Sequence, residues 1–278
     1  WSVLCGLAST VFAAQDGEVE LRIVHTNDTH SCVMPVNPNS SDTALADKGG
    51  FVRRATLVRD LRAEDPDLLL FDSGDFSQGS AYYNLYKGDV EVKLMNEMRY
   101  DAATIGNHEF DFGLDNMARI FREAAFPIVC ANYHFEGTVL EGLVRPYVIL
   151  ERKGVKVGVF GLGTQLEGMV ASENYKGVTY EDPVTAANRV ADELKNKEHC
   201  DLVVCLSHLG WDIDGLDDTE LVSATRHIDI VLGGHSHTYF EHPEVLKNAD
   251  GEDVYCNQMG KHGRYVGMLL LEMSPTGD

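Results

Sequence analysis

The sequence predicts a layered α/β domain, and three observations support this prediction. Short runs rich in leucine and β-branched residues alternate with helical segments over nearly all of the 278 residues. Several runs, such as DLLLF, DLVVCL and DIVL, are apolar at nearly every position, which indicates strands buried on both faces. The composition, with 44% hydrophobic and 24% charged residues, is typical of a folded globular protein. No repeat, linker or shift in composition interrupts this pattern, so we expect one domain.

The individual elements follow from the spacing of apolar residues. Short apolar runs predict strands at 21–25, 68–72, 102–105, 128–131, 147–150, 156–160, 202–206, 228–232 and 265–273. Longer segments predict helices at 50–64, 90–98, 114–124, 184–197 and 218–225. In the first helix, Val52, Ala55, Val58 and Leu61 lie near one stripe. Pro183 suits the first turn of the fourth helix, where its missing N–H has no intrahelical partner to lose.

The first 14 residues (WSVLCGLASTVFAA) are apolar and uncharged, they end in small residues, and the polar segment QDGE follows at once. This pattern is typical of the hydrophobic region and cleavage site of a secretory signal. We therefore expect residues 1–14 to be the remnant of a signal peptide, and the protein to be exported to the periplasm or the extracellular space. The alternatives are a first helix packed on the domain and a membrane anchor, which is less favoured because so short a segment cannot span a bilayer.

The chain is strongly acidic, with 23 Lys and Arg against 44 Asp and Glu and a formal net charge of −21. Nucleic acid polymers and anionic membrane surfaces would be repelled, so both are disfavoured as partners. A small anion held by bound metal remains allowed, because cations reverse the local charge. No apolar run is long enough to span a bilayer.

Six cysteines show no spacing typical of a redox or zinc motif. Cys200 and Cys205 flank one predicted strand and should lie about 16 Å apart. That distance is too great for a disulfide. Cys130, Cys205 and Cys256 are expected to be small buried residues.

Metal-binding side chains follow five of the apolar runs. Ligands bind α/β sheets beyond the carboxyl ends of the strands, where loops converge, so we expect these side chains to meet at one edge. The candidates are Asp28, His30, Asp75, Asn107, His208, His235 and His237.

The spacing and chemistry of these candidates indicate a pair of divalent ions. In Asp-x-His and His-x-His one residue separates the ligands, and in extended backbone such residues face the same side. Oxygen and imidazole donors without thiolate suit Mn, Fe, Zn, Co or Ni. Seven ligands are too many for one four-coordinate ion, but they suffice for two if a carboxylate bridges them. Such a pair is the usual arrangement for in-line displacement at phosphorus.

Five motifs carry a resemblance to a known family: HTNDTH, DSGDFSQGS, TIGNHEFDFG, LSHLG and GGHSHT. In this order they resemble the signature blocks of the calcineurin-like metallophosphoesterases, and more narrowly the N-terminal catalytic domain of the 5′-nucleotidases. The segments GGFVRRATLVRDLR and YYNLYKGDVEVKLMNEM are also similar to that subfamily. The resemblance covers about residues 19–273. It implies a four-layer α/β/β/α sandwich, with the catalytic domain at 19–278.

The resemblance also implies roles for individual residues. One ion would be held by Asp28, His30, Asp75 and His237, and the other by Asp75, Asn107, His208 and His235, with Asp75 bridging. His108 and Asp111 match the family's catalytic dyad, in which the aspartate orients the histidine beside the leaving group. The implied nucleophile is a metal-activated water, the ions clamp phosphate oxygens, and His108 stabilises charge on the departing ester.

The resemblance is incomplete in one respect. Family nucleotidases usually carry a second, C-terminal domain whose aromatic residues hold the base, and we expect this domain to be absent from the chain. Either it was cut away, or the catalytic domain works alone, or a separate chain completes the site.

Other polar and aromatic residues are expected to be structural. His25 should pack in its strand. Arg53 and Arg54 could steady a phosphate, but pairing with local carboxylates is the favoured interpretation. Three tyrosines near the site could help to hold a leaving group, but core packing is the favoured interpretation for Tyr82, Tyr83 and Tyr86. Solvent exposure is expected for His134, His199, His227, His242 and His262.

The leading functional hypothesis is therefore a dinuclear metal-dependent phosphoester hydrolase that removes phosphate from 5′-nucleotides. The alternatives are a cyclic-nucleotide phosphodiesterase, a general phosphomonoesterase and, outside enzymes, a metal-stabilised nucleotide-binding module. A module without activity would be free to lose ligands, and none is missing here.

Overall fold

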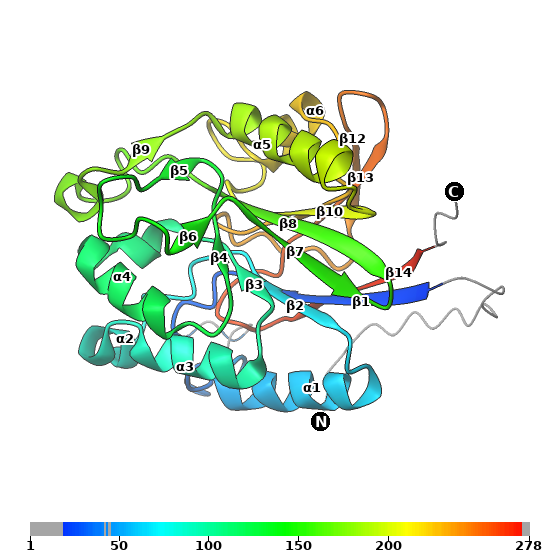
Figure 1. Ribbon diagram of the computed structural model, residues 1–278. Helices are drawn as coiled ribbons and strands as arrows, with labels where there is room; N and C mark the ends of the chain where they lie inside the picture. Colours follow the sequence, from blue (N-terminus) through cyan, green and yellow to red (C-terminus); the bar gives the residue numbers. More distant parts are fainter. Residues whose placement is uncertain (1–18, 42, 44–45, 274–278) are drawn as a thin grey trace.

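Two six-stranded β-sheets lie face to face in the computed structural model, with helices on the outer face of each sheet (Figure 1). The structure describes residues 19–41, 43 and 46–273. The layers follow the order helix, sheet, sheet, helix, as the family resemblance implies. The predicted signal segment 1–14 lies outside the described residues.

The first sheet is mainly parallel. Its strands, in spatial order, are β14 (Gly267–Met273), β1 (Val19–Thr26), β2 (Leu69–Asp72), β3 (Ala102–Ala103), β4 (Ile128–Val129) and β6 (Val144–Arg145). β14 pairs antiparallel with β1, and the other neighbours are parallel. Its outer face is covered by α1 (Phe51–Glu64), α3 (Asp89–Met98) and α4 (Gly113–Glu123) (Figure 1).

The second sheet has a parallel centre and antiparallel edges. Its strands, in spatial order, are β12 (Glu244–Lys247), β13 (Asp253–Asn257), β11 (Ile230–Leu232), β10 (Leu202–His208), β8 (Val155–Gly163) and β7 (Tyr147–Arg152). β12 and β7 run antiparallel to their neighbours. Its outer face is covered by α5 (Pro183–Asp192) and α6 (Asp218–Ala224) (Figure 1). The predicted role of Pro183 in the first turn of α5 is confirmed, and Asp182 caps this helix by accepting the N–H of Thr185 at 2.8 Å.

The region around β2 shows why the apolar runs lack alternation. Leu69 and Phe71 belong to the core between the two sheets, whereas Leu68 and Leu70 belong to the core beneath the helices. None of the four side chains is exposed. Burial of each such side chain stabilises the fold by about 2 kcal/mol. The predicted burial on both faces is thus confirmed.

Several elements differ from the prediction. The predicted helix 184–197 consists of α5 followed by a π-helical turn at Glu193–Lys197. In α1 the stripe prediction is wrong at Val52, which is 76% exposed, because Phe51, Arg54 and Val58 face the core instead. The elements without a sequence prediction are α2 (Ala81–Tyr86), the 3₁₀ turns Asn107–Phe110 and Ser172–Tyr175, β12, β13, β6 and the two-stranded sheet of β5 (Tyr133–His134) and β9 (Thr179–Tyr180).

The predictions for the cysteines hold in the described part of the chain. Cys130, Cys205 and Cys256 are buried, and neither they nor Cys32 or Cys200 forms a disulfide there.

Asp72 ends β2 as a buried carboxyl group directly before the loop of the second motif. Thr26 Oγ1 donates to Asp72 Oδ2 at 2.6 Å, and the N–H of Gly74 donates to Oδ1 at 3.0 Å. Burial raises the pKa of Asp72 to about 7, although the bond from Thr26 and the charge of Arg54 oppose this shift. The folded state therefore favours the protonated form of Asp72 more than the unfolded chain does.

We expect Asp72→Asn to reduce the loss of stability with rising pH. The folded-state pKa lies above the value of about 4 in an unfolded chain. The contribution of Asp72 is thus fully present below pH 4 and is lost as the pH rises through about 7. The free energy of unfolding is measured in urea at pH 5 and at pH 8 for both proteins. The difference between the two pH values should be smaller in Asp72→Asn than in wild type, by on the order of 1 kcal/mol or more. The exposed Asp60→Asn serves as control, and an unchanged pH dependence in Asp72→Asn would contradict this assignment.

Candidate metal centre

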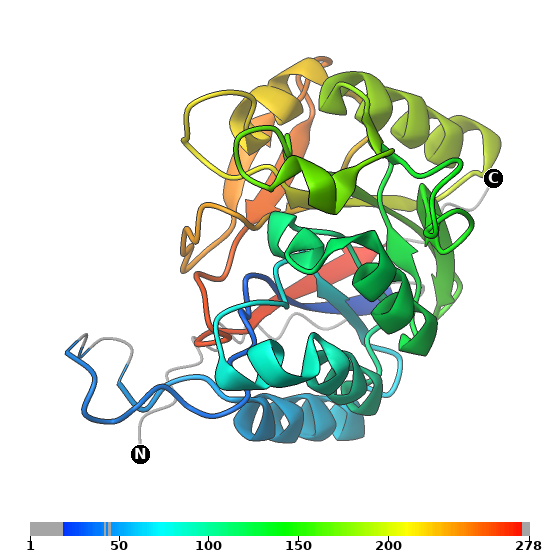
Figure 2. The same cartoon turned by 90° about the vertical axis from the view of Figure 1, so that its left-hand side faces the viewer.

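All of the predicted ligands lie at one edge of the sandwich, beyond the carboxyl ends of the parallel strands. Figure 2 looks onto this edge, where the loops after the strands converge. Asp28 and His30 follow β1, Asp75 follows β2, Asn107 follows β3, His208 ends β10, and His235 and His237 follow β11. Parallel pairing brings these ends together, because adjacent parallel strands finish on the same side of a sheet.

The first group of ligand atoms comes from two distant segments. Asp28, His30 and His237 each offer one ligand atom within 4.8 Å of the others. Asp28 Oδ1 lies 3.4 Å from His237 Nε2 and 3.8 Å from His30 Nε2. Asp28 is fully buried, so its carboxylate is held away from water. These residues are three of the four that the resemblance assigns to one ion.

The second group is formed by Asp75, His208 and His235, again within 4.8 Å of one another. His208 Nδ1 lies 2.6 Å from the carbonyl oxygen of Ser73, so Nδ1 carries the proton and Nε2 faces Asp75 Oδ2 at 3.2 Å. Burial lowers the pKa of a histidine, but the charge of Asp75 outweighs burial and raises the pKa of His208 to about 10. Asp75 also lies within 4.8 Å of a ligand atom of His30, which places it between the two groups.

The donor atoms suit metal ions better than they suit one another. His30 Nε2 and His237 Nε2 lie 3.0 Å apart, and a hydrogen bond between them requires that only one of the two nitrogens carries a proton. Asn107 Oδ1 is buried without a hydrogen-bond partner in the described part of the chain, whereas His208 Nε2 has the Asp75 carboxylate 3.2 Å away. An unpaired buried polar group costs about 1–3 kcal/mol, and a cation would supply the missing partner. The residues therefore fit two ions.

The backbone at the ligands is unusual. Asp28, His30, Asp75, His235 and His237 all have positive φ, between 43° and 71°. The extended backbone expected at the Asp-x-His and His-x-His pairs is therefore wrong, and His235 and His237 belong to different ligand groups. Positive φ disfavours residues other than glycine and persists only where the surroundings impose it. Backbone hydrogen bonds between the first two loops do so, since the N–H of Asp28 donates to the Gly74 carbonyl at 2.9 Å and that of His30 to the Asp75 carbonyl at 3.0 Å.

Glu109 supports the centre without touching it, and the sequence analysis did not identify this role. Its fully buried carboxylate accepts the N–H of Asp75 at 3.0 Å, of Gly106 at 2.7 Å and of Ser77 at 3.1 Å. A Cβ at position 106 would overlap Asp75 Oδ1, so this position requires glycine. The signal in the sequence is the glutamate three residues after Gly106, the spacing of a capping box.

Two amide side chains hold the remaining ligand loops, and they too were not predicted. Asn27 Nδ2 donates to Asp28 Oδ2 at 2.6 Å and to the carbonyl of Gly260 at 2.8 Å. Gln258 Nε2 donates to the carbonyl of Gly234 at 2.9 Å. Both residues connect loops that are more than 20 positions apart, so only the folded chain reveals the contacts.

His108 and Asp111 form a close pair beside the metal groups. His108 Nδ1 lies 3.1 Å from Asp111 Oδ2, and this hydrogen bond raises the pKa of His108. The backbone N–H of His108 donates to Asp75 Oδ1 at 2.9 Å, and its carbonyl accepts the hydroxyl of Tyr83 at 3.2 Å. Asn174 Nδ2 donates to the carbonyl of Asp111 at 2.9 Å. The pair is thus held by three other segments, namely the loop after β2, α2 and the 3₁₀ turn Ser172–Tyr175.

One histidine differs from its prediction and another agrees with it. His262, expected in solvent, packs against the ring of His30 with centroids 5.8 Å apart, and its N–H donates to the Asp28 carbonyl at 2.7 Å. Burial lowers the pKa of His262 to about 4. His25 is buried in β1 as predicted, and burial lowers its pKa to about 3.

The arginines and tyrosines near the site are only partly as predicted. Arg53 pairs with Asp47 at 3.0 Å, as expected. The pairing predicted for Arg54 is wrong within the described residues, where its buried guanidinium has no hydrogen bond and lies 4.0 Å from the ring centre of Phe51. Core packing holds for Tyr83, but Tyr82 and Tyr86 are 37% and 52% exposed, because α2 turns them outward.

Comparison with known proteins agrees with this geometry. Residues 21–239 match the family model described as calcineurin-like phosphoesterase. A 5′-nucleotidase of Homo sapiens is 32% identical, over 100% of this chain and 50% of that protein. The chain spans about half the length of the curated relatives it matches.

Solved structures show the same similarity. The crystal structure of a 5′-nucleotidase precursor from Thermus thermophilus is 33% identical, with a TM-score of 0.80, and the match covers 91% of this chain and 51% of that one. The NAD nucleotidase of Haemophilus influenzae is 26% identical, with a TM-score of 0.81, and the match covers 94% and 48% of the two chains.

Proposed function

Because the chain belongs to the calcineurin-like phosphoesterase family, we propose that it is a dinuclear metal-dependent hydrolase that removes phosphate from 5′-nucleotides. The observation that carries this proposal is the pair of ligand groups with Asp75 between them and the pair of His108 and Asp111 beside them. The nucleotide preference is supported by the similarity to 5′-nucleotidases.

Each ion has a set of protein ligands in this proposal. Asp28, His30, Asp75 and His237 would hold one ion, and Asp75, Asn107, His208 and His235 the other. When bound, such ions supply Lewis-acid stabilisation of phosphate oxygens and lower the pKa of a bound water. Oxygen and nitrogen donors of this kind accept Mn, Zn, Fe or Co.

His108 and Asp111 are the protein groups that assist the departure of the ester oxygen. Asp111 holds the Nδ1–H of His108, which directs Nε2 away from the carboxylate and toward the side where the ester leaves. The bond to Asp111 raises the pKa of His108, so the imidazole keeps its proton to a higher pH than a free histidine. A protonated imidazole can donate to the departing ester oxygen and stabilise its charge.

We propose an exported location, periplasmic or extracellular, which the apolar segment 1–14 supports. In the described part of the chain no helix has the length and apolar character needed to cross a membrane.

Removal of metal is expected to abolish activity reversibly. The purified protein is treated with chelator and then supplied with Mn or Zn, and phosphate release is measured from 5′-AMP, a cyclic nucleotide, ribose 5-phosphate and p-nitrophenyl phosphate. Hydrolysis of 5′-AMP should fall to background and return with the metal. The reason is that the proposed ions stabilise the charge on the phosphate oxygens and activate the attacking water. Turnover that survives complete metal removal would refute the proposal, and turnover of the cyclic nucleotide alone would replace it with a phosphodiesterase.

A further inference from the structure

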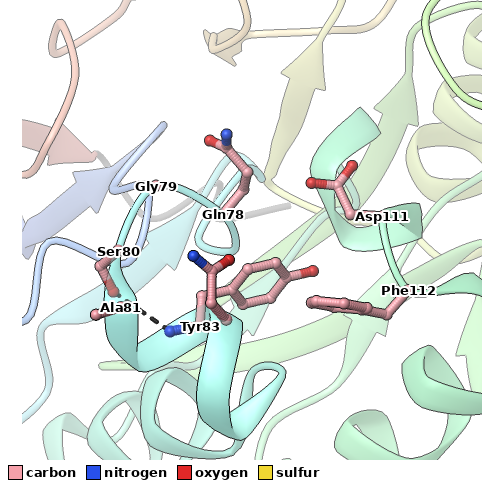
Figure 3. Close-up of a pocket in the computed structure, with 8 residues that line it drawn as sticks. Gln78, Gly79, Ser80, Ala81, Tyr83, Asp111 and Phe112 are labelled. Atoms are coloured by element: carbon pink, nitrogen blue, oxygen red, sulfur yellow. Dashed lines mark hydrogen bonds between the residues drawn. The ribbon is translucent and has the colours of Figure 1, made fainter.

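Open space and protein chain border different parts of the metal centre. A cavity of about 540 Å³ lies beside Asp111, lined by residues of the segment 78–84, which includes the start of α2, and by Phe112 (Figure 3). None of the proposed metal ligands lines this cavity. The first ligand group is instead bordered by the segment 258–265, which lies between β13 and β14 and contributes none of the candidate ligands.

The segment 258–265 is bonded to the loop that carries His237. Gln258 Oε1 accepts the N–H of Thr238 at 2.5 Å and the hydroxyl of Ser236 at 3.0 Å. The carbonyl of Thr238 in turn accepts the N–H of Gly260 at 2.8 Å. The residues on both sides of His237 are therefore fixed to this segment.

The same segment is bonded to the loop that carries Asp28 and His30. Asn27 Oδ1 accepts the N–H of Met259 at 2.8 Å. The N–H of His262 donates to the Asp28 carbonyl at 2.7 Å, and the ring of His262 packs against that of His30 with centroids 5.8 Å apart and planes inclined at 60°. One segment therefore holds both loops that supply the first ligand group.

Arg54 of α1 is a third support of the segment. A Cβ at position 263 would overlap Nη1 of Arg54, so the chain passes this guanidinium as closely as glycine allows. The guanidinium is itself buried and lies 4.0 Å from the ring centre of Phe51. His262 has a φ of 62°, a conformation that persists in a residue other than glycine only where its surroundings impose it. The position of His262 is thus imposed by packing on several sides.

Fixing the two loops matters for metal binding. His30 and His237 are 207 positions apart in the chain, yet their Nε2 atoms lie 3.0 Å apart. Ligands that are already ordered lose less conformational freedom when they bind. Residues that orient metal ligands typically change metal affinity by about 10–100-fold when they are replaced.

His262 acts on the first group more selectively than Gln258 does. The contacts of His262 with candidate ligands, at Asp28 and His30, both belong to the first group. Gln258 also donates to the carbonyl of Gly234, the residue before a ligand of the second group. Replacing His262 is therefore the sharper test.

We propose that the segment 258–265 is a clamp that joins the two halves of the first ligand group and sets the affinity of this group for its ion. Within the clamp, His262 is the positioning residue that holds the ring of His30. This inference rests on the proposed dinuclear function and deepens it, because the two ions are then controlled by different parts of the chain.

The test measures the two ligand groups separately. His235→Ala removes a ligand of the second group only, and His237→Ala removes a ligand of the first group only. Binding of Mn²⁺ is measured by equilibrium dialysis in both backgrounds, with and without His262→Ala. His199→Ala is the matched control, because His199 is an exposed histidine with a similar φ of 55° and precedes β10, at the opposite end of that strand from the metal centre.

In the His235→Ala background we expect His262→Ala to raise the Kd for Mn²⁺ about tenfold. In the His237→Ala background the Kd should change by less than about twofold, and His199→Ala should change it no more than that in either background. His262→Phe keeps a ring of similar size against His30 and should restore the Kd to within about threefold.

Four outcomes would overturn the clamp. They are equal increases of Kd in the two backgrounds, no increase in the His235→Ala background, no Mn²⁺ binding in that background, and no restoration by His262→Phe. Thermal unfolding of the metal-free protein shows whether the fold is intact. Because the ring of His262 is only half-buried, His262→Ala should unfold within about 3 °C of His199→Ala.

Failure of the clamp and failure of the proposed function give different results, because Mn²⁺ binding is measured without substrate. Normal turnover of 5′-AMP together with equal changes of Kd in the two backgrounds overturns the clamp and leaves the hydrolase. Absence of turnover on every phosphate ester, together with a selective change of Kd, overturns the hydrolase and leaves the clamp.

Discussion

Replacing Asp75 with alanine is expected to abolish phosphate release from 5′-AMP, by at least about 10⁴-fold, because both ligand groups lose a carboxylate at once. Asp75 Oδ2 faces His208 at 3.2 Å, and Oδ1 accepts the N–H of His108 at 2.9 Å. The substitution therefore removes the proposed bridge between the ions and the bond that places the backbone of the dyad. In the described part of the centre, no other single side chain contacts both a candidate ligand such as His208 and the backbone of His108.

Metal content is the decisive measurement for this variant. Wild type should contain two ions per chain after loading and dialysis, and Asp75→Ala at most one. The exposed Asp60→Ala should match wild type in both metal content and activity. Two ions retained in Asp75→Ala would show that the bridging assignment is wrong, even if activity were lost.

His108→Ala is expected to lower activity on 5′-AMP by about 10²–10³-fold while leaving the two ions in place, less than the loss in Asp75→Ala. The proposed task of His108 is to stabilise the departing ester oxygen, so the loss should depend on how well that oxygen leaves. On p-nitrophenyl phosphate, whose leaving group needs little help, the loss should be at most about tenfold.

Asp111→Asn provides the comparison for this prediction. It keeps the shape of the side chain but replaces the carboxylate whose hydrogen bond raises the pKa of His108. We expect an intermediate loss on 5′-AMP, again smaller on p-nitrophenyl phosphate. A loss of equal size on both substrates would assign His108 a role in holding phosphate or the ions rather than in assisting the leaving group.

The candidate ligand groups could be predicted because their chemistry is local. Asp28 and His30 lie one residue apart, as do His235 and His237, and each pair follows an apolar strand. A buried parallel strand ends at a predictable place, and its neighbours end at the same edge. The candidate ligands therefore followed from strand order and residue type, without knowledge of any contact between side chains.

Contacts between distant segments were not predictable in the same way. His262 lies in a polar loop of the sequence, and only the return of β14 beside β1 brings it against His30. The short helix α2 is too brief to show helical periodicity, and it is fixed by the hydroxyl of Ser80 accepting the N–H groups of Tyr82 and Tyr83 at 3.1 and 3.3 Å. The wall of the cavity depends on this helix, so the cavity could not be inferred from composition or spacing.

The sequence by itself determined the fold class, the family and the set of candidate ligands with the dyad, because strand patterning and short motifs encode them within a few residues. The tertiary structure decided what surrounds that set. It placed the buried Glu109 across three backbone N–H groups, left the Phe112 ring partly exposed beside Tyr83 and opened a cavity next to Asp111. These features depend on the distances between segments far apart in the chain, and such distances exist only once the two sheets have packed.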